Sequence, residues 1–348
     1  MSYLSMRYVV NIDSETEAKI RRLVELGVCR DVHQFIDVAI RNQLQLEYSS
    51  LEEPLGSETA LLSKPVKHAF SEVLQIPPPS VKTVPPPTNF ERGPLWGQYY
   101  RFLPLKVVLR VVANMSVNSL PSVEEAENNC ITIATEIGER LRKVDREMAN
   151  DKGRKLSTAF PRKNEKSQER FVSQYLGYTQ SGKGVLRGMG PALLFVNMIN
   201  GTVGLTSFGL RFASLENPVI DKIDYRYPIS NEEADFIIDH LIENIPDEAA
   251  HALWLLQGLK DGLRSRVQIN DHMRKFYAKY GHWTDKMVET MRAGLVSRLS
   301  ELGFIKVSYS GKNVSYVLTT RGSMAVDKLE KKTELIRASL NGGKNTNV

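Results

Sequence analysis

The six histidines are the residues of this sequence best suited to metal binding or acid–base chemistry, but their spacing favours neither. They are His33, His68, His240, His251, His272 and His282. No two of them stand at the spacing of metal ligands, and no acidic motif accompanies them. The two cysteines, Cys29 and Cys130, are too few for a zinc site or a disulfide framework. We therefore expect no catalytic residues, no metal site, no cofactor and no enzymatic activity.

Positive charge is the chemical feature that the sequence does concentrate. The chain has a net charge of +6 and a pI near 9.1, which permits binding to a polyanion. Basic side chains gather in the second half of a long helix predicted over residues 123–148 and in the stretch 151–166. They are Arg140, Lys143, Arg146, Lys152, Arg154, Lys155, Arg162 and Lys163. We expect them to contact phosphates, because each displaced counterion strengthens binding; the alternative is a solvated loop.

Residues 6–13 show the alternation that is typical of a β-strand. Tyr8, Val10 and Ile12 share one apolar face, and the opposite face carries Arg7, Val9 and Asn11. A single strand of this length is not stable alone, and no matching strand follows nearby. The pattern therefore predicts that the strand pairs with its copy on a second chain.

Two short helices are predicted directly after this strand. The first follows an N-cap at Asp13 or Ser14 and ends at Gly27, and Asp31 caps the second. A strand, a helix, a glycine turn and a capped helix within residues 6–46 resemble the ribbon-helix-helix family of DNA-binding repressors and plasmid-control proteins. The resemblance implies a homodimer through residues 6–46 that places its ribbon in the major groove of double-stranded DNA.

The resemblance also implies roles for single residues. Arg7 would donate to guanine and Asn11 would pair with adenine, while Val9 could contact only a thymine methyl group. The start of the second helix would hold a DNA phosphate. The residues there are Arg30, Asp31, Val32 and His33. The alternative is a ribbon that dimerises the chain without reading bases.

The remainder of the chain divides into predicted linkers and domains. Nine of the sixteen prolines fall between Pro54 and Pro94, so residues 48–94 are expected to form an extended linker. A winged-helix-like domain with a basic insertion is expected at 95–217, a connector at 218–246, a winged-helix domain at 247–340 and a disordered tail at 341–348.

The two predicted winged-helix units are based on helix and hairpin patterns. Asn200-Gly201 marks a hairpin in the first unit, and strands are expected at 304–309 and 314–319 in the second. Three helices followed by a hairpin and a last helix resemble the order of a winged-helix domain. Both units have Leu-Thr three residues before a glycine, at Leu205-Thr206 and Leu318-Thr319, which suggests an internal repeat.

The third helix and the hairpin of a winged-helix domain usually contact DNA. In the second unit, the residues expected on this surface are Lys286, Thr290, Arg292, Lys306, Tyr309 and Lys312. The alternative is that the winged-helix units bind a protein partner.

These patterns together predict a mainly α fold with small β elements (α+β), made of a ribbon-helix-helix domain and two winged-helix-like units. No apolar stretch is long enough to span a membrane, so a cytoplasmic protein is expected. The expected function is sequence-specific DNA binding by a dimeric transcriptional regulator. The alternatives are a replication initiator or partition protein of a mobile element, and a protein-binding adaptor dimerised by the ribbon.

Overall fold

The computed structural model describes residues 13–25, 31–32, 36, 74–148, 155–310 and 313–342. The chain forms two compact units, residues 1–66 and 67–348. In the first unit, helix α1 (Ser14–Glu25) follows Asp13, whose carboxylate accepts from the main-chain N–H of Thr16 at 2.8 Å. This confirms the predicted first helix. The predicted strand with Arg7, Val9 and Asn11 lies outside the described residues, as do Arg30 and His33.

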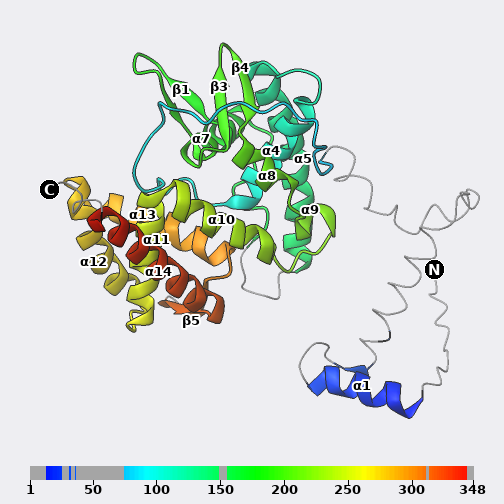
Figure 1. Cartoon of the computed structure of the whole chain (residues 1–348). Coiled ribbons are helices and arrows are strands. Elements are labelled where there is room, and N and C mark those ends of the chain that lie inside the picture. The colour runs from blue at the N-terminus through cyan, green and yellow to red at the C-terminus, as the bar shows by residue number, and fades with distance from the viewer. Residues whose placement is uncertain are drawn as a thin grey trace, which may run out of the picture. The chain divides into compact units, whose positions relative to one another are not determined.

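The second unit is mainly helical with small antiparallel sheets, which confirms the α+β prediction in its general form (Figure 1). Its helices are α4 (Phe102–Met115), α5 (Val123–Glu147), α6 (Glu165–Tyr175), α7 (Met189–Ala192), α8 (Ser207–Ser214), α9 (Pro218–Asp221), α10 (Asn231–Asn244), α11 (Pro246–Lys260), α12 (Arg266–Tyr277), α13 (Asp285–Glu301) and α14 (Thr320–Gly342). Its strand pairs are β1 (Tyr178–Gln180) with β2 (Val185–Arg187), β3 (Val196–Ile199) with β4 (Thr202–Leu205), and β5 (Ile305–Ser310) with β6 (Asn313–Leu318). None of the described helices has the length and apolarity needed to cross a membrane.

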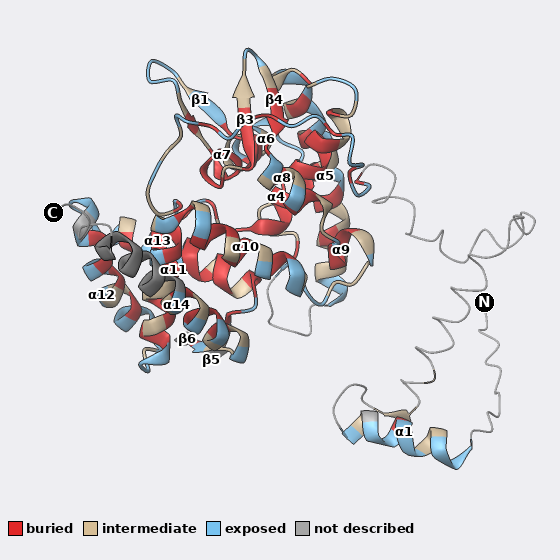
Figure 2. Ribbon diagram, in the orientation of Figure 1, coloured by how far each residue is buried: buried red, intermediate tan, exposed pale blue. Residues whose placement is uncertain are grey.

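Helix α4 lies in the core of this unit, and Figure 2 shows it almost wholly buried. Even its two charged side chains are buried. Lys106 pairs with Glu233 at 2.8 Å, and Arg110 pairs with Asp221 at 2.5 Å. Both carboxylates come from the expected connector 218–246, which therefore contributes α9, α10 and buried charges to the body of the fold.

One hydrophobic core runs from Leu74 to Leu329 and includes residues from both predicted winged-helix units. Residues 95–217 and 247–340 thus belong to one compact unit. A buried arginine connects them, because Arg298 on α13, which pairs with Glu248 on α11 at 2.7 Å, also donates to the carbonyl oxygen of Tyr99 at 2.5 Å. This arrangement holds α13 against the segment that leads into α4.

Residues 74–94 differ from the expected linker because they lie along the folded body. The main-chain N–H of Val84 donates to Leu205 O at 2.8 Å, next to a parallel bridge between Thr83 and Leu205. Further along, Glu91 N donates to Leu186 O at 3.1 Å. The described part of the proline-rich sequence is fixed by main-chain hydrogen bonds to two of the hairpins.

The two segments of the predicted repeat share features of local geometry. Ser122 and Ser265 are the N-caps of α5 and α12, and each forms a capping box with the residue three positions later. Each serine also forms an antiparallel bridge to the second strand of a hairpin, Ser122 to Thr202 and Ser265 to Ser315. Both bridges lie three residues before the final leucine of the strand.

The ends of the two hairpins also match. Thr206 and Thr319 follow the strands, and each accepts at its hydroxyl the N–H of a glycine three residues later, Gly209 at 3.1 Å and Gly322 at 2.9 Å. A Cβ atom on either glycine would lie 2.1 or 2.2 Å from the carbonyl oxygen of the phenylalanine before the hairpin. The Leu-Thr pattern therefore marks a place where only glycine allows the next helix to approach.

Candidate functional site

A hollow of about 1000 Å³, here called the α13 groove, lies beside α13, the hairpin β5–β6 and residues 155–158. It is lined by five cationic side chains, Arg101, Lys155, Arg266, Arg292 and Lys306. None of the described residues that line it is Asp or Glu. Hydroxyl groups of Thr158, Tyr227, Ser297, Ser300, Tyr316 and Thr319 add hydrogen-bonding capacity. The lining therefore suits a polyanion with many oxygen acceptors.

Helix α13 is positioned by contacts on two sides. Thr284 caps its N-terminus. Further along, α13 contacts the segment 95–103 through Gly97 and Phe102. Gly294 lies against Gly97 so closely that an added Cβ would be 2.3 Å from Gly97 O. The stripe left toward solvent includes Lys286 and Thr290, which are exposed where the sequence predicts them.

Arg292 lies deeper than predicted. It is only 8% exposed, and it donates to Asn270 Oδ1 at 2.7 Å and to the Tyr316 hydroxyl at 3.0 Å. Both partners are neutral, and no described carboxylate lies within ion-pair distance. Arg292 is therefore part of the groove floor, and the sequence periodicity that placed it at the border of the outer surface underestimated its burial.

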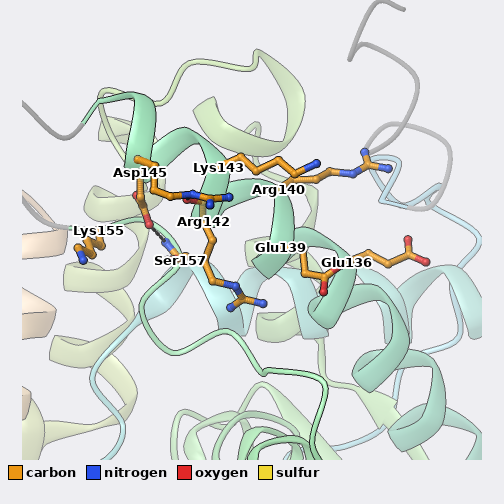
Figure 3. Close-up of a pocket in the computed structure, with 9 residues that line it drawn as sticks. Glu136, Glu139, Arg140, Arg142, Lys143, Asp145, Lys155 and Ser157 are labelled. Atoms are coloured by element: carbon orange, nitrogen blue, oxygen red, sulfur yellow. Dashed lines mark hydrogen bonds between the residues drawn. The ribbon is translucent and has the colours of Figure 1, made fainter.

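A second hollow of about 810 Å³, the α5 hollow, lies on the C-terminal half of α5 (Figure 3). It is lined by Glu136, Glu139, Arg140, Arg142, Lys143, Asp145, Arg146, Lys155 and Ser157. Four of these are predicted phosphate-contact residues, and five cations against three carboxylates leave a net charge of +2. The mixed lining makes this hollow a weaker anion site than the α13 groove.

Lys155 lines both hollows and joins them. Its loop is held by Asp145, whose carboxylate accepts from Leu156 N at 2.8 Å and Ser157 N at 3.0 Å (Figure 3). Figure 3 also shows Arg140 and Lys143 extending in one direction from α5. Asp145 thus positions Lys155 between the two hollows.

The other predicted contact residues are not part of either hollow. Arg162 and Lys163 are exposed, and Lys163 forms a surface ion pair with Glu139 at 2.9 Å. Asp31 and Val32 are half-buried in the first unit. Lys152, Arg154, Lys312 and the side chain of Tyr309 lie outside the described residues.

Two groove residues, Arg101 and Arg266, are absent from the sequence-based set. Arg266 follows the N-cap Ser265 directly, so the capping box Ser265–Gln268 is a signal that could have placed it at the exposed start of a helix. Arg101 has no such signal, because its position depends on contacts with residues far along the chain.

The described face of the first repeat that corresponds to the α13 groove is covered by other residues. Through the shared geometry, Arg266, Lys306 and Tyr316 correspond to Val123, Asn197 and Val203. Asn197 donates from Nδ2 to Pro85 O at 2.8 Å, so the proline-rich segment covers this face. The second repeat therefore keeps this face open, and Arg101 and Lys155 add cations to it from residues 95–217.

The described histidines lie mainly in structural hydrogen-bond networks. His240 and His251 are buried, and burial lowers the pKa of His240. His251 lies between Glu248 at 3.0 Å and the Tyr277 hydroxyl at 2.5 Å. Within the described part of the chain, no three His, Cys, Asp or Glu side chains lie close enough to hold a metal ion. Comparison with family models, curated proteins and solved structures finds no match to this chain.

Proposed function

We propose that the protein is a sequence-specific DNA-binding protein that acts as a homodimeric transcriptional regulator. The observation that carries this proposal is the α13 groove, where five cations and several hydroxyl groups line one hollow without a described carboxylate. A site of this charge favours the phosphate backbone, which supplies much of the affinity of protein–DNA complexes. The neighbouring α5 hollow extends the basic surface through Lys155.

The order of elements supports a winged-helix interpretation of the second repeat. Helices α11, α12 and α13 are followed by the hairpin β5–β6 and by α14. The antiparallel bridge from Ser265 to Ser315 pairs one residue before α12 with the second strand of this hairpin. In winged-helix domains, the third helix and the hairpin are the DNA-contacting elements, and they are the elements that line the groove here.

Base recognition is assigned to the N-terminal ribbon. Arg7 and Asn11 would read bases, with Val9 at a thymine methyl group. The groove would then hold the backbone of neighbouring DNA and raise the effective concentration of the ribbon. Two weak contacts on one chain can bind together far more tightly than either alone.

The proposal can be tested with the full chain in an electrophoretic shift assay against random competitor DNA. Sites selected from a random library should bind the wild type at moderate salt. Arg7→Ala combined with Asn11→Ala should weaken this specific binding while sedimentation still shows a dimer. Absence of any binding above the competitor would remove the proposal and favour a protein-binding adaptor.

A second candidate, a replication initiator or partition protein of a mobile element, is favoured by the internal repeat. The matched geometry at Ser122 and Ser265 supports two related units in tandem, an arrangement that suits such proteins. Footprinting on host DNA separates the candidates. A single site at a promoter supports the regulator, whereas an array of direct repeats at a replication origin supports the initiator.

A further inference from the structure

Arg101 is a buried cation with an unused donor. It lines the α13 groove but is only 4% exposed. Its Nη2 donates to Lys155 O at 2.9 Å, whereas its buried Nε finds no hydrogen-bond acceptor among the described residues. Burying a donor of a charged group without an acceptor is costly, and it leaves the hydrogen-bonding capacity of this guanidinium only partly used.

The carboxylate that pairs with Arg101 compensates its charge only in part. Glu301 Oε1 lies 3.8 Å from Arg101 Nη1, which is beyond hydrogen-bond distance. The oxygens of Glu301 accept instead from Phe102 N at 2.6 Å and Leu103 N at 3.4 Å. These bonds also occupy the first amides of α4, so an anion at Arg101 would not depend on that helix terminus.

Apart from Glu301, which does not line the groove, the groove residues beside Arg101 are cationic or neutral. Lys155 is exposed beside Arg101. Its main chain is held by the hydrogen bond from Arg101 to Lys155 O and by the bonds from the next two amides to Asp145. Thr158 and Ser300 are half-buried and line the same hollow. A guanidinium fork, an ammonium and two hydroxyl groups are the donors that recognise a phosphoryl group.

We propose that the Arg101 end of the α13 groove is a phosphoryl-binding site, with Arg101 and Lys155 as its charged ligands. The phosphoryl group comes either from the backbone of bound DNA or from a free polyphosphate. Only the first source rests on the function proposed above. Arg101 belongs to the first repeat and α13 to the second, so the site also joins the two repeats around one anion.

The opposite end of the groove offers a control within the same surface. Arg292 lies nine residues before Glu301 on α13, roughly 13 Å away along the helix axis. Arg266 starts α12, the helix whose Asn270 accepts from Arg292. Arg266 is thus a cation of the groove at a distance from Arg101, and Arg170 on α6 is an exposed cation outside both hollows.

The test uses the full chain in two titrations. Calorimetry follows the binding of inorganic pyrophosphate, with sodium chloride holding the ionic strength constant. Anisotropy follows a labelled duplex of mixed sequence. Arg101→Gln, Arg101→Lys and Lys155→Gln are compared with Arg266→Gln and Arg170→Gln. Arg101→Lys keeps the charge but loses the fork, so weaker binding in this variant reports hydrogen-bond geometry.

Pyrophosphate affinity should fall about tenfold in the Arg101 and Lys155 variants and less than twofold in the two controls. If pyrophosphate does not bind but duplex affinity falls in the Arg101 and Lys155 variants relative to Arg170→Gln, the source is the DNA backbone. If Arg101 variants do not fold, Lys155→Gln decides, because its side chain is exposed.

The proposal is overturned if neither titration responds to Arg101 or Lys155. DNA binding that is unchanged in these variants, without pyrophosphate binding, would leave the proposed function standing and remove this site. Pyrophosphate binding that depends on Arg101, in a chain that binds no DNA, would keep this site and remove the proposed function.

Discussion

Replacing three exposed cations of the α13 groove should flatten the salt dependence of DNA binding. The groove variant combines Lys155→Gln, Arg266→Gln and Lys306→Gln. All three side chains are exposed, and none makes an ion pair within the described part of the fold. The fold should therefore tolerate the changes, and their effect should be confined to binding.

The magnitude follows from counterion release. Each phosphate contact contributes about 0.9 to the slope of log K against log salt, so three lost contacts lower the slope by about 2.7. At about 0.1 M salt this corresponds to a loss of affinity of up to roughly 500-fold. A smaller change would mean that fewer than three of these cations meet phosphates.

The assay is fluorescence anisotropy with a mixed-sequence duplex between about 50 and 200 mM salt, a range in which backbone contacts dominate. A matched variant carries Lys82→Gln, Arg170→Gln and Lys183→Gln, which remove the same charge from exposed positions outside both hollows. Equal slopes for the groove and matched variants would refute the assignment of the groove, since net charge alone would then explain the loss.

Two further predictions concern the stability of the fold. Glu248→Gln should lower the free energy of unfolding at pH 7 by about 3–5 kcal/mol, because it leaves Arg298 buried without its carboxylate. Burial raises the pKa of Glu248, but Arg298 and the other donors around it outweigh this, so the net pKa lies below 4.5. The carboxylate therefore stabilises the fold above about pH 4.5 and loses this effect as pH falls, so urea unfolding of wild type and variant should converge in acid; a constant difference would contradict the pair's role. Gly322→Ala should cost about 1–3 kcal/mol, because its Cβ would lie 2.2 Å from Phe304 O, and an unchanged melting temperature would contradict that contact.

Local elements of the second unit were predictable because their signals lie in adjacent residues. Asn200-Gly201 predicts the hairpin β3–β4, and Asn200 and Gly201 adopt the positive φ values that such a turn requires. The apolar run before this turn starts at Ala192, but the strand begins only at Val196, because Leu194 adopts a φ of 57° after the short helix α7. The start of this strand thus depends on the backbone conformation of Leu194, which the pattern of apolar residues does not predict.

The candidate site was predictable only in part. The basic cluster around Arg140 and Lys155 follows from composition, and Lys306 follows from its place on the hairpin. Arg292 was expected near the outer surface but lies in the floor of the groove, because Asn270 and Tyr316 hold it there. Helical periodicity gives the direction of a side chain but not the depth of the layer packed over it.

Local sequence signals predict the long helix α5, the three helices and the hairpin of the second repeat, the hairpin β3–β4 and the Leu-Thr pattern, because each depends on hydrogen bonds between residues a few positions apart. They do not predict α9 and α10, which lie in the expected connector. Which of the two repeats keeps an open face depends on tertiary packing. Residues 74–94 cover the first, while Arg101 is brought to α13 of the second across some two hundred residues of chain. Such contacts arise from packing of distant segments into one core, and no local pattern encodes which segments will meet.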